Sequence, residues 1–241
     1  MLTTVKGIVL HHVDYGDTSV IAHVYTDLYG RLSVMISGIR GRKSKFSMNM
    51  IQPLSAVEME IYYRENRSVH RVRELGNYIH YHSIPYNIGK STQAMFVSEI
   101  LFKALREEEK NIQLFEFLEH AIQIFDLQER STNNFHLVFL ISLSKYLGFF
   151  PQDNYSEGAC LFDLRNGHFT AAPVSHPDHL DQSLSAGLHK LLAVNMKEAE
   201  NLRIGYKLRV ELIRAVIDYF RLHINDFGKV KSVDVIREVL R

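Results

Sequence analysis

The chain has 241 residues, with 28 Lys and Arg against 27 Asp and Glu, so its formal net charge is only +1. A hydrophobic content of 46% and a charged content of 23% are ordinary for a folded protein and exclude a disordered or collagen-like chain. The single cysteine, Cys160, excludes an internal disulfide and a zinc site built from several cysteines. We therefore expect one large domain or two small ones, in a reducing compartment.

The N-terminus lacks a charged region followed by an apolar core, so we expect no signal peptide and a cytoplasmic location. The longest apolar run, residues 135–150, is interrupted by His136, Ser142, Ser144 and Lys145. This run predicts a buried helix rather than a membrane span.

The first 80 residues are organised as short segments of alternating polarity separated by turn residues. The alternation has a period of two, which places apolar side chains on one face of each predicted strand. The expected strands are residues 4–13, 19–26, 31–37, 56–63 and 68–78. Five short antiparallel strands with this spacing suit a small closed barrel such as an OB-fold.

From residue 81 onward, apolar residues recur at helical spacing. The expected helices are residues 91–105, 112–127, 133–147, one from about 183, then 203–223 and 232–240. Residues 151–182 interrupt them with a polar stretch that contains a predicted hairpin around an Asn-Gly turn, with strands 160–164 and 168–171. The predicted fold class is α+β: a five-stranded OB-fold β-barrel (residues 1–80), followed by an α-helical domain (residues 81–241) with a small insert.

Positive charge is concentrated in and around the loop after the third predicted strand. Residues 1–82 hold ten Lys and Arg against seven Asp and Glu, and no acidic residue lies between Asp27 and Glu58. The basic residues of this stretch are Arg31, Arg40, Arg42, Lys43 and Lys45. A flexible basic loop suits a phosphate backbone, because Lys and Arg neutralise phosphates and release counterions. The alternative is a solvated loop that needs charge for solubility.

The fifth predicted strand carries a second group of candidates for phosphate contact. Arg67, Arg71 and Arg73 share one face by the period of two, with cross-strand pairing to Glu58 or Glu60 as the alternative. Several aromatic residues could stack on bases, with ordinary packing as the alternative: Tyr15, Tyr25, Tyr29, Phe46, Tyr62 and Tyr63.

The predicted helix 203–223 carries a third basic group. Four basic residues fall within roughly 40° of one another around the helix axis, at about 100° per residue. They are Arg203, Lys207, Arg214 and Arg221. This stripe is either a contact for phosphates or for an acidic protein tail, or the solvated face of a bundle helix.

No motif in the sequence indicates a catalytic or metal-binding site. Cys160, His168, His176 and His179 match no standard zinc spacing, so we expect no metal and no cofactor. The chain has no Gly-x-Ser-x-Gly, His-Glu-x-x-His or Gly-x-Gly-x-x-Gly motif. No residue pattern therefore points to a catalytic site, and a hydrolase built on the three histidines is a further alternative.

An ordered set of short motifs runs along the chain. The set comprises Gly7-Ile-Val-Leu10, Tyr15-Gly-Asp-Thr-Ser19, Thr26 before the turn at Gly30, Gly38-Ile-Arg40, Ser44-Lys45, Gln52-Pro53, Tyr219-Phe-Arg-Leu-His223 and Lys231-Ser232. This set resembles the RecO family, bacterial mediators of DNA repair and recombination. The resemblance covers nearly the whole chain in the order barrel, helices, irregular insert, helices.

The resemblance implies an OB-fold, a helical domain, no enzymatic turnover, and binding to single- and double-stranded DNA. It implies annealing of complementary strands and, with the partner RecR, help in replacing single-strand-binding protein (SSB) by the recombinase RecA. It also implies that the acidic C-terminal tail of SSB binds the helical domain. Carried onto this sequence, the barrel's basic residues become the DNA candidates, and the stripe Lys207, Arg214 and Arg221 becomes a candidate for DNA or for that tail.

The insert departs from the family pattern. Many members carry a four-cysteine zinc module between the helices, whereas residues 151–182 of this chain keep only Cys160. The segment therefore resembles a zinc module without its ligands, and we expect apolar packing to hold its hairpin. An alternative interpretation of the whole chain is a protein–protein adaptor that binds acidic partner tails and contacts DNA only incidentally.

Overall fold

The computed structural model describes residues 1–41, 44–129, 133–172 and 174–239. The chain divides into two compact units, Met1–Tyr86 with Ala94–Asp126 and Asn87–Gln93 with Leu127–Arg241. Helix α1 (Ile88–Ala104) contributes its first residues to the second unit and its remainder to the first. The domain boundary expected near residue 80 stays a prediction.

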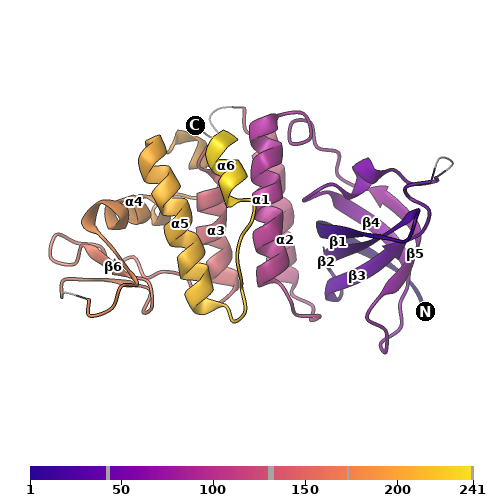
Figure 1. The fold of residues 1–241 in the computed structure, drawn as a ribbon, viewed down its shortest axis with the longest axis horizontal. Coiled ribbons are helices and arrows are strands. Elements are labelled where there is room, and N and C mark those ends of the chain that lie inside the picture. The colour runs from indigo at the N-terminus through magenta and orange to yellow at the C-terminus, as the bar shows by residue number, and fades with distance from the viewer. Residues whose placement is uncertain (42–43, 130–132, 173, 240–241) are drawn as a thin grey trace. The chain divides into compact units, whose positions relative to one another are not determined.

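Five strands of the first unit close into a barrel in the order β1-β2-β3-β5-β4 (Figure 1). They are β1 (Leu2–Tyr15), β2 (Ser19–Thr26), β3 (Gly30–Ile36), β4 (Ala56–Tyr62) and β5 (His70–Asn77). The predicted OB-fold barrel is confirmed. One detail of the prediction is wrong, because β3 and β5 pair in parallel, through Val34 with His70 and Met35 with Arg71, and this pairing closes the barrel.

The barrel interior is filled by the apolar residues of the alternating pattern. Three residues of β2 and three of β3 are at most 3% exposed: Val20, Ala22, Val24, Leu32, Val34 and Ile36. The 3₁₀ helix Met48–Ile51, between β3 and β4, adds Ile51 to the same core. Because each fully buried aliphatic side chain stabilises a fold by about 1.5–3 kcal/mol, this core accounts for the closure of the barrel.

The turn between β2 and β3 contacts the connection from α1 to α2 (Ile112–Leu127). Gly30 has a φ of 61°, and a Cβ at this position would lie 2.4 Å from the carbonyl oxygen of Glu109. The N–H of Arg31 donates a hydrogen bond to the carbonyl oxygen of Glu107, at 3.0 Å. Only glycine fits both the backbone conformation and this close approach, so the connection is docked on the barrel.

The substitution Gly30→Ala is expected to destabilise the protein by roughly 2–4 kcal/mol, from backbone strain and from the clash with Glu109. Gly16→Ala is the matched control, because Gly16 has a φ of 60° and nothing within 4 Å of its Cβ position. The control is expected to lose only about 1–2 kcal/mol, since it adds strain without a clash. Urea unfolding measures both losses; equal losses would contradict the tight docking.

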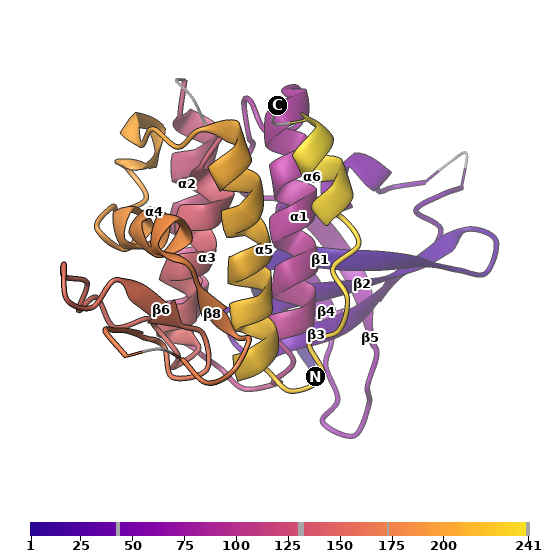
Figure 2. The same ribbon diagram turned by 60° about the vertical axis from the view of Figure 1, so that its left-hand side comes forward.

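The second unit contains α3 (Phe135–Tyr146), α4 (Gln182–Leu192) and α5 (Tyr206–His223), which pack against one another (Figure 2). The 3₁₀ helix Ala199–Asn201 precedes α5, and α6 (Val233–Val239) follows it. The helix ends lie close to the predicted positions, and α2 has the predicted bounds. Among the described residues, no helix has the length and apolar character needed to cross a membrane.

Residues 151–182 contain a small three-stranded sheet in the order β7-β6-β8. Its strands are β6 (Leu161–Asp163), β7 (His168–Thr170) and β8 (His179–Leu180). Strands β6 and β7 form the predicted hairpin, and the buried rings of Phe162 and Phe169 lie 4.9 Å apart between centroids. Apolar packing therefore holds the hairpin, and β8 is an addition that the sequence did not predict.

Candidate nucleic-acid interface

A groove of about 460 Å³ lies on the barrel surface, where β4 turns into β5. Its lining residues come from β3, β4, β5 and the connection between β4 and β5: Met35, Tyr62, Arg64, Arg67, Val69 and Arg71. The groove brings together two predicted DNA candidates, Arg67 and Arg71. It adds Arg64, which the sequence analysis missed.

Strand register explains why these side chains share one surface. Arg71 on β5 pairs with Tyr62 on β4 and with Met35 on β3, so the three residues form a row across three strands. Since side chains alternate along a strand, the neighbours Tyr63 and His70 point to the other side. Tyr62, which lines the groove, is 50% exposed.

The three groove arginines carry charge that no acidic side chain among the described residues neutralises by an ion pair. Within the described part of the chain, Arg64, Arg67 and Arg71 form no ion pair. A guanidinium group presents a planar fork of donors that matches phosphate oxygens, and an exposed aromatic ring beside it can stack on a base. The groove can therefore bind a phosphate backbone and one of its bases.

Arg73 lies outside the groove lining. The pairing of β4 with β5 shifts between Glu60 and Ile61, and Arg73 falls at this irregularity. Its guanidinium group forms an ion pair with Glu60 at 3.4 Å, which is the cross-strand alternative considered from the sequence. Arg67 also differs from its predicted place, because β5 begins only at His70 and Arg67 lies in the preceding connection.

The described residues of the basic loop are paired with acidic side chains. Arg40 forms an ion pair with Asp14 at 2.8 Å, and Lys45 forms one with Glu74. The other two predicted contacts of this loop, Arg42 and Lys43, lie outside the described residues. Exposed ion pairs stabilise a fold by only about 0–1 kcal/mol. Arg40 and Lys45 therefore remain predicted DNA contacts, and on binding they would leave the carboxylates of Asp14 and Glu74 for DNA phosphates.

Arg31 faces the end of α1 instead of the groove. Its guanidinium group donates hydrogen bonds to the carbonyl oxygens of Phe102, at 3.1 Å, and Leu105, at 3.2 Å. The same group lies 5.3 Å from the centroid of the Phe102 ring. Carbonyl groups at the C-terminus of a helix lack partners within the helix, so Arg31 caps α1 and has a structural role that its charge alone did not reveal.

Two of the six aromatic candidates, Tyr29 and Tyr63, are occupied by a contact with each other. Tyr29 stacks on Tyr63 with 4.1 Å between ring centroids, and Tyr63 stacks on His70 with 4.8 Å. Tyr15 and Tyr62 are 54% and 50% exposed. These two tyrosines are therefore the best placed for stacking on a base.

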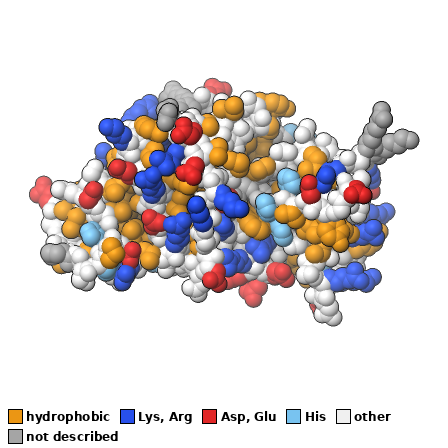
Figure 3. Space-filling model, viewed as in Figure 1, with side chains coloured by type: hydrophobic (Ala, Val, Ile, Leu, Met, Phe, Trp, Pro, Cys, Tyr) orange, Lys and Arg blue, Asp and Glu red, His pale blue; other side chains and the backbone are white. Residues whose placement is uncertain are grey.

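The exposed side of α5 carries both signs of charge. In chain order its charged residues are Lys207, Glu211, Arg214, Asp218 and Arg221. Arg221 pairs with Asp218 at 2.9 Å. Arg203 lies before the helix and donates to the carbonyl oxygen of Glu200. The predicted basic stripe is therefore a mixed surface, and Figure 3 shows blue and red side chains interspersed over this part of the molecule.

The histidines of the insert do not converge. His176 contacts Asp163 at 3.4 Å, whereas a ring nitrogen of His179 contacts the backbone carbonyl oxygen of His176 and a ring nitrogen of His168 contacts that of Asn166. Across the residues that the structure describes, no cluster of three or more His, Cys, Asp or Glu is arranged to hold a metal ion. The geometry therefore gives no support to the hydrolase alternative.

The fold and the groove define a class of protein: an OB-fold barrel with a basic, partly aromatic surface, followed by helices. Figure 3 shows Lys and Arg side chains on the barrel at the right of the view. Barrels of this type commonly bind single-stranded nucleic acid.

Comparison with known proteins identifies the family. Residues 1–77 match the family "Recombination protein O N terminal", and residues 85–232 match "Recombination protein O C terminal". The chain is 39% identical to the DNA repair protein RecO of Phocaeicola vulgatus and 37% identical to that of Bacteroides fragilis, each over 99% of both chains. It is 32% identical to the RecO of Azobacteroides pseudotrichonymphae over 99% of both chains. The chain belongs to the RecO family of DNA repair proteins.

Proposed function

We propose that this protein binds DNA through the groove of its barrel and acts as a non-enzymatic mediator of recombinational repair in the cytoplasm. The observation that carries the proposal is the groove itself, which Arg64, Arg67 and Arg71 line together with the exposed Tyr62. Membership of a family of DNA repair proteins supports it. The basic loop residues Arg40, Arg42, Lys43 and Lys45 would extend the contact.

The proposed physical basis of strand annealing is charge neutralisation. Two complementary strands repel each other through their phosphates, and a basic surface that holds one strand lowers that repulsion. Tyr62 would keep one base unstacked from its neighbours while the phosphates beside it contact the arginines. A strand held in this way stays able to pair with its complement.

We also propose that the second unit contacts partner proteins. The candidates are a RecR-like mediator partner and the acidic C-terminal tail of SSB, with RecA affected only indirectly. Lys207 and Arg214 are exposed on α5 and form no ion pair with any described residue, which supports an acidic tail as a partner. Glu211 and Asp218 on the same side would limit the attraction.

Fluorescence anisotropy with labelled single- and double-stranded oligonucleotides across a salt series tests DNA binding. The logarithm of the affinity should fall linearly with the logarithm of the salt concentration, by about 0.7 per phosphate contact for single strands and about 0.9 for duplex DNA. Annealing of complementary oligonucleotides should weaken over the same salt range. Absence of binding at low salt, together with binding of an acidic tail peptide, would favour the adaptor interpretation instead.

A further inference from the structure

The second half of β1 has a neighbouring strand on one side only. β1 pairs with β2 as far as Tyr15 but with β4 only as far as Ile8. The two residues that follow Ile8 still bond to the connection before β4 and to α1. On this side of residues 11–15, the backbone N–H and C=O groups form no hydrogen bond with any residue that the structure describes. Residues 11–15 are therefore an open strand edge.

The side chains of this open edge are accessible. Val13 and Tyr15 are 43% and 54% exposed. The Asp14 side chain is 65% exposed, and among the described residues its carboxylate is paired through Oδ2 alone, with Arg40 at 2.8 Å. Proteins commonly protect an unpaired strand edge with lysine or proline, because its backbone groups are a template for another strand. The open edge has neither residue, so it can accept a further strand.

The sequence of the open edge is complementary to itself. If a second copy pairs with it in antiparallel register about Val13, Val13 lies opposite Val13 of that copy. His12 then lies opposite Asp14 of the second copy, and His11 lies opposite Tyr15, each twice because of the two-fold symmetry. Pairs of β-branched, aromatic and oppositely charged side chains are favourable directly across an antiparallel ladder. The chemistry of the edge therefore fits a second copy of this chain.

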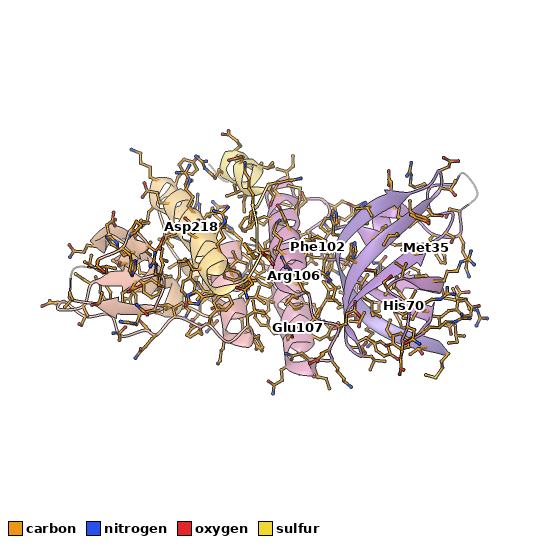
Figure 4. The ribbon with its side chains drawn as sticks, turned by 60° about the horizontal axis from the view of Figure 1, so that its bottom comes forward. Met35, His70, Phe102, Arg106, Glu107 and Asp218 are labelled. Carbon is orange, nitrogen blue, oxygen red and sulfur yellow. The ribbon has the colours of Figure 1, made fainter. Side chains whose placement is uncertain are left out.

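The open edge continues the face of the sheet that carries the groove. Val13 pairs with Ile21, Ile21 pairs with Met35, and Met35 pairs with Arg71. Residues that pair directly across strands share one face, so these four residues form a row that ends in the groove. In Figure 4, Met35 marks this row at the right of the barrel, away from Phe102 of α1.

We propose that two copies of this chain pair through their open edges, with Val13 on the two-fold axis, to form a dimer with a continuous sheet. The two Arg71 residues are then separated by three strand spacings in each barrel and one across the axis. At about 4.8 Å per spacing, the two grooves lie at most about 34 Å apart. Each groove would hold one of two complementary strands. That consequence rests on the proposed function, whereas the dimer itself is tested without DNA.

Sedimentation velocity over a concentration series of the full chain, without DNA, tests the dimer. The mass of the native protein should rise from 27.9 kDa toward twice that value. Val13→Lys places two like charges opposite each other on the axis and should raise the dissociation constant of the dimer at least tenfold. Thr18→Lys is the matched control, because it adds the same charge at an exposed turn residue of the same hairpin. A native mass that stays at 27.9 kDa throughout, or equal effects of the two variants, would overturn the dimer.

Two substitutions of His12 test the register of the pairing. His12→Lys should tighten the dimer several-fold and His12→Asp should weaken it several-fold, because the partner across the edge is Asp14 of the second copy. Effects in the same direction would contradict this register. Urea unfolding of each variant checks that the fold is retained.

Disulfide formation tests the position of the axis. In a Cys160→Ser background, Val13→Cys brings two cysteines directly opposite each other, where Cα atoms of antiparallel strands lie about 4.5–5.5 Å apart, within the reach of a disulfide. With a mild oxidant, this variant should form a covalent dimer on a non-reducing gel, and Thr18→Cys in the same background should not. Equal linkage at both positions would overturn the dimer. Absence of salt-dependent DNA binding would refute the proposed function instead, so the two failures are distinguishable.

Discussion

Replacing Arg64, Arg67 and Arg71 together by alanine is expected to weaken the binding of single-stranded DNA roughly tenfold or more at low salt. Each substitution removes a guanidinium group that no described acidic side chain neutralises, from a groove that also presents Tyr62. The groove arginines are exposed or lie in the β4–β5 connection, so the fold should be retained. Anisotropy with a labelled oligonucleotide measures the loss.

The salt dependence of the same variant separates phosphate contacts from a general loss of charge. Three lost phosphate contacts should reduce the slope of log affinity against log salt by about 2 for single strands. The matched control is Lys145→Ala, Lys190→Ala and Lys197→Ala, which removes three exposed positive charges from the second unit. A control that loses as much affinity and slope as the groove variant would contradict the assignment of the groove.

The second large effect is expected for Asp126→Asn, which should destabilise the fold by roughly 3 kcal/mol. The Asp126 carboxylate is buried and accepts hydrogen bonds from the backbone N–H groups of His82, at 2.7 Å, Ser83, at 2.8 Å, and Ile84, at 2.9 Å. Hydrogen bonds to a charged group contribute about 1.5–3 kcal/mol each, and an amide loses the charge and one acceptor. This carboxylate ties the segment that leaves the barrel to the end of α2.

The effect should depend on pH in a defined direction. Burial raises the pKa of Asp126, but the hydrogen bonds from His82, Ile84 and Ser83 outweigh it and hold the pKa below its ordinary value. A carboxylate with a lowered folded-state pKa stabilises the fold above its unfolded pKa of about 3.9, and this stabilisation is lost as the pH falls through the folded-state pKa. In urea unfolding, the free energy of unfolding of the native protein should therefore exceed that of Asp126→Asn by a large amount at neutral pH and by a small amount in acid.

Asp17→Asn provides the control for this experiment. Asp17 is exposed in the turn between β1 and β2, so its substitution should change the stability by less than about 0.5 kcal/mol at any pH. The free energy of unfolding is compared between the native protein and Asp126→Asn. If the difference stays constant from neutral to acid pH, the charge of Asp126 is not the cause of the destabilisation.

Local sequence patterns were sufficient for most elements of the fold. Helix α2 has the predicted bounds, 112–127, because its apolar residues repeat at helical spacing within one continuous segment. The parallel pairing of β3 with β5 was not predicted, because Val34 and His70 are far apart in the sequence and nothing local specifies their register. Strand β8 has only two residues, which is too short for any periodicity.

The candidate site was predicted only in part, for similar reasons. The alternation of side chains along a strand predicted the place of Arg71, because Arg71 lies on a regular strand. Arg64 lies in a connection, where no such periodicity exists. The capping role of Arg31 depends on carbonyl groups some seventy residues further along the chain. The mixed charge of α5 was visible in the sequence, because Glu211 and Asp218 fall on the same helical face as the cations, and a wheel that includes both signs reveals it.

Site-specific photocrosslinking tests the central claim, that DNA lies in the arginine groove, most directly. A photoreactive phenylalanine derivative would replace Tyr62 in the groove or, in a second protein, Tyr15, which is similarly exposed and follows Asp14, the ion-pair partner of Arg40 in the basic loop. Both proteins would be irradiated with labelled single-stranded DNA at the same fractional saturation. We predict that position 62 gives the dominant crosslink and that excess unlabelled DNA suppresses it. A dominant crosslink at position 15, with little at position 62, would contradict the account and place the DNA on the basic loop.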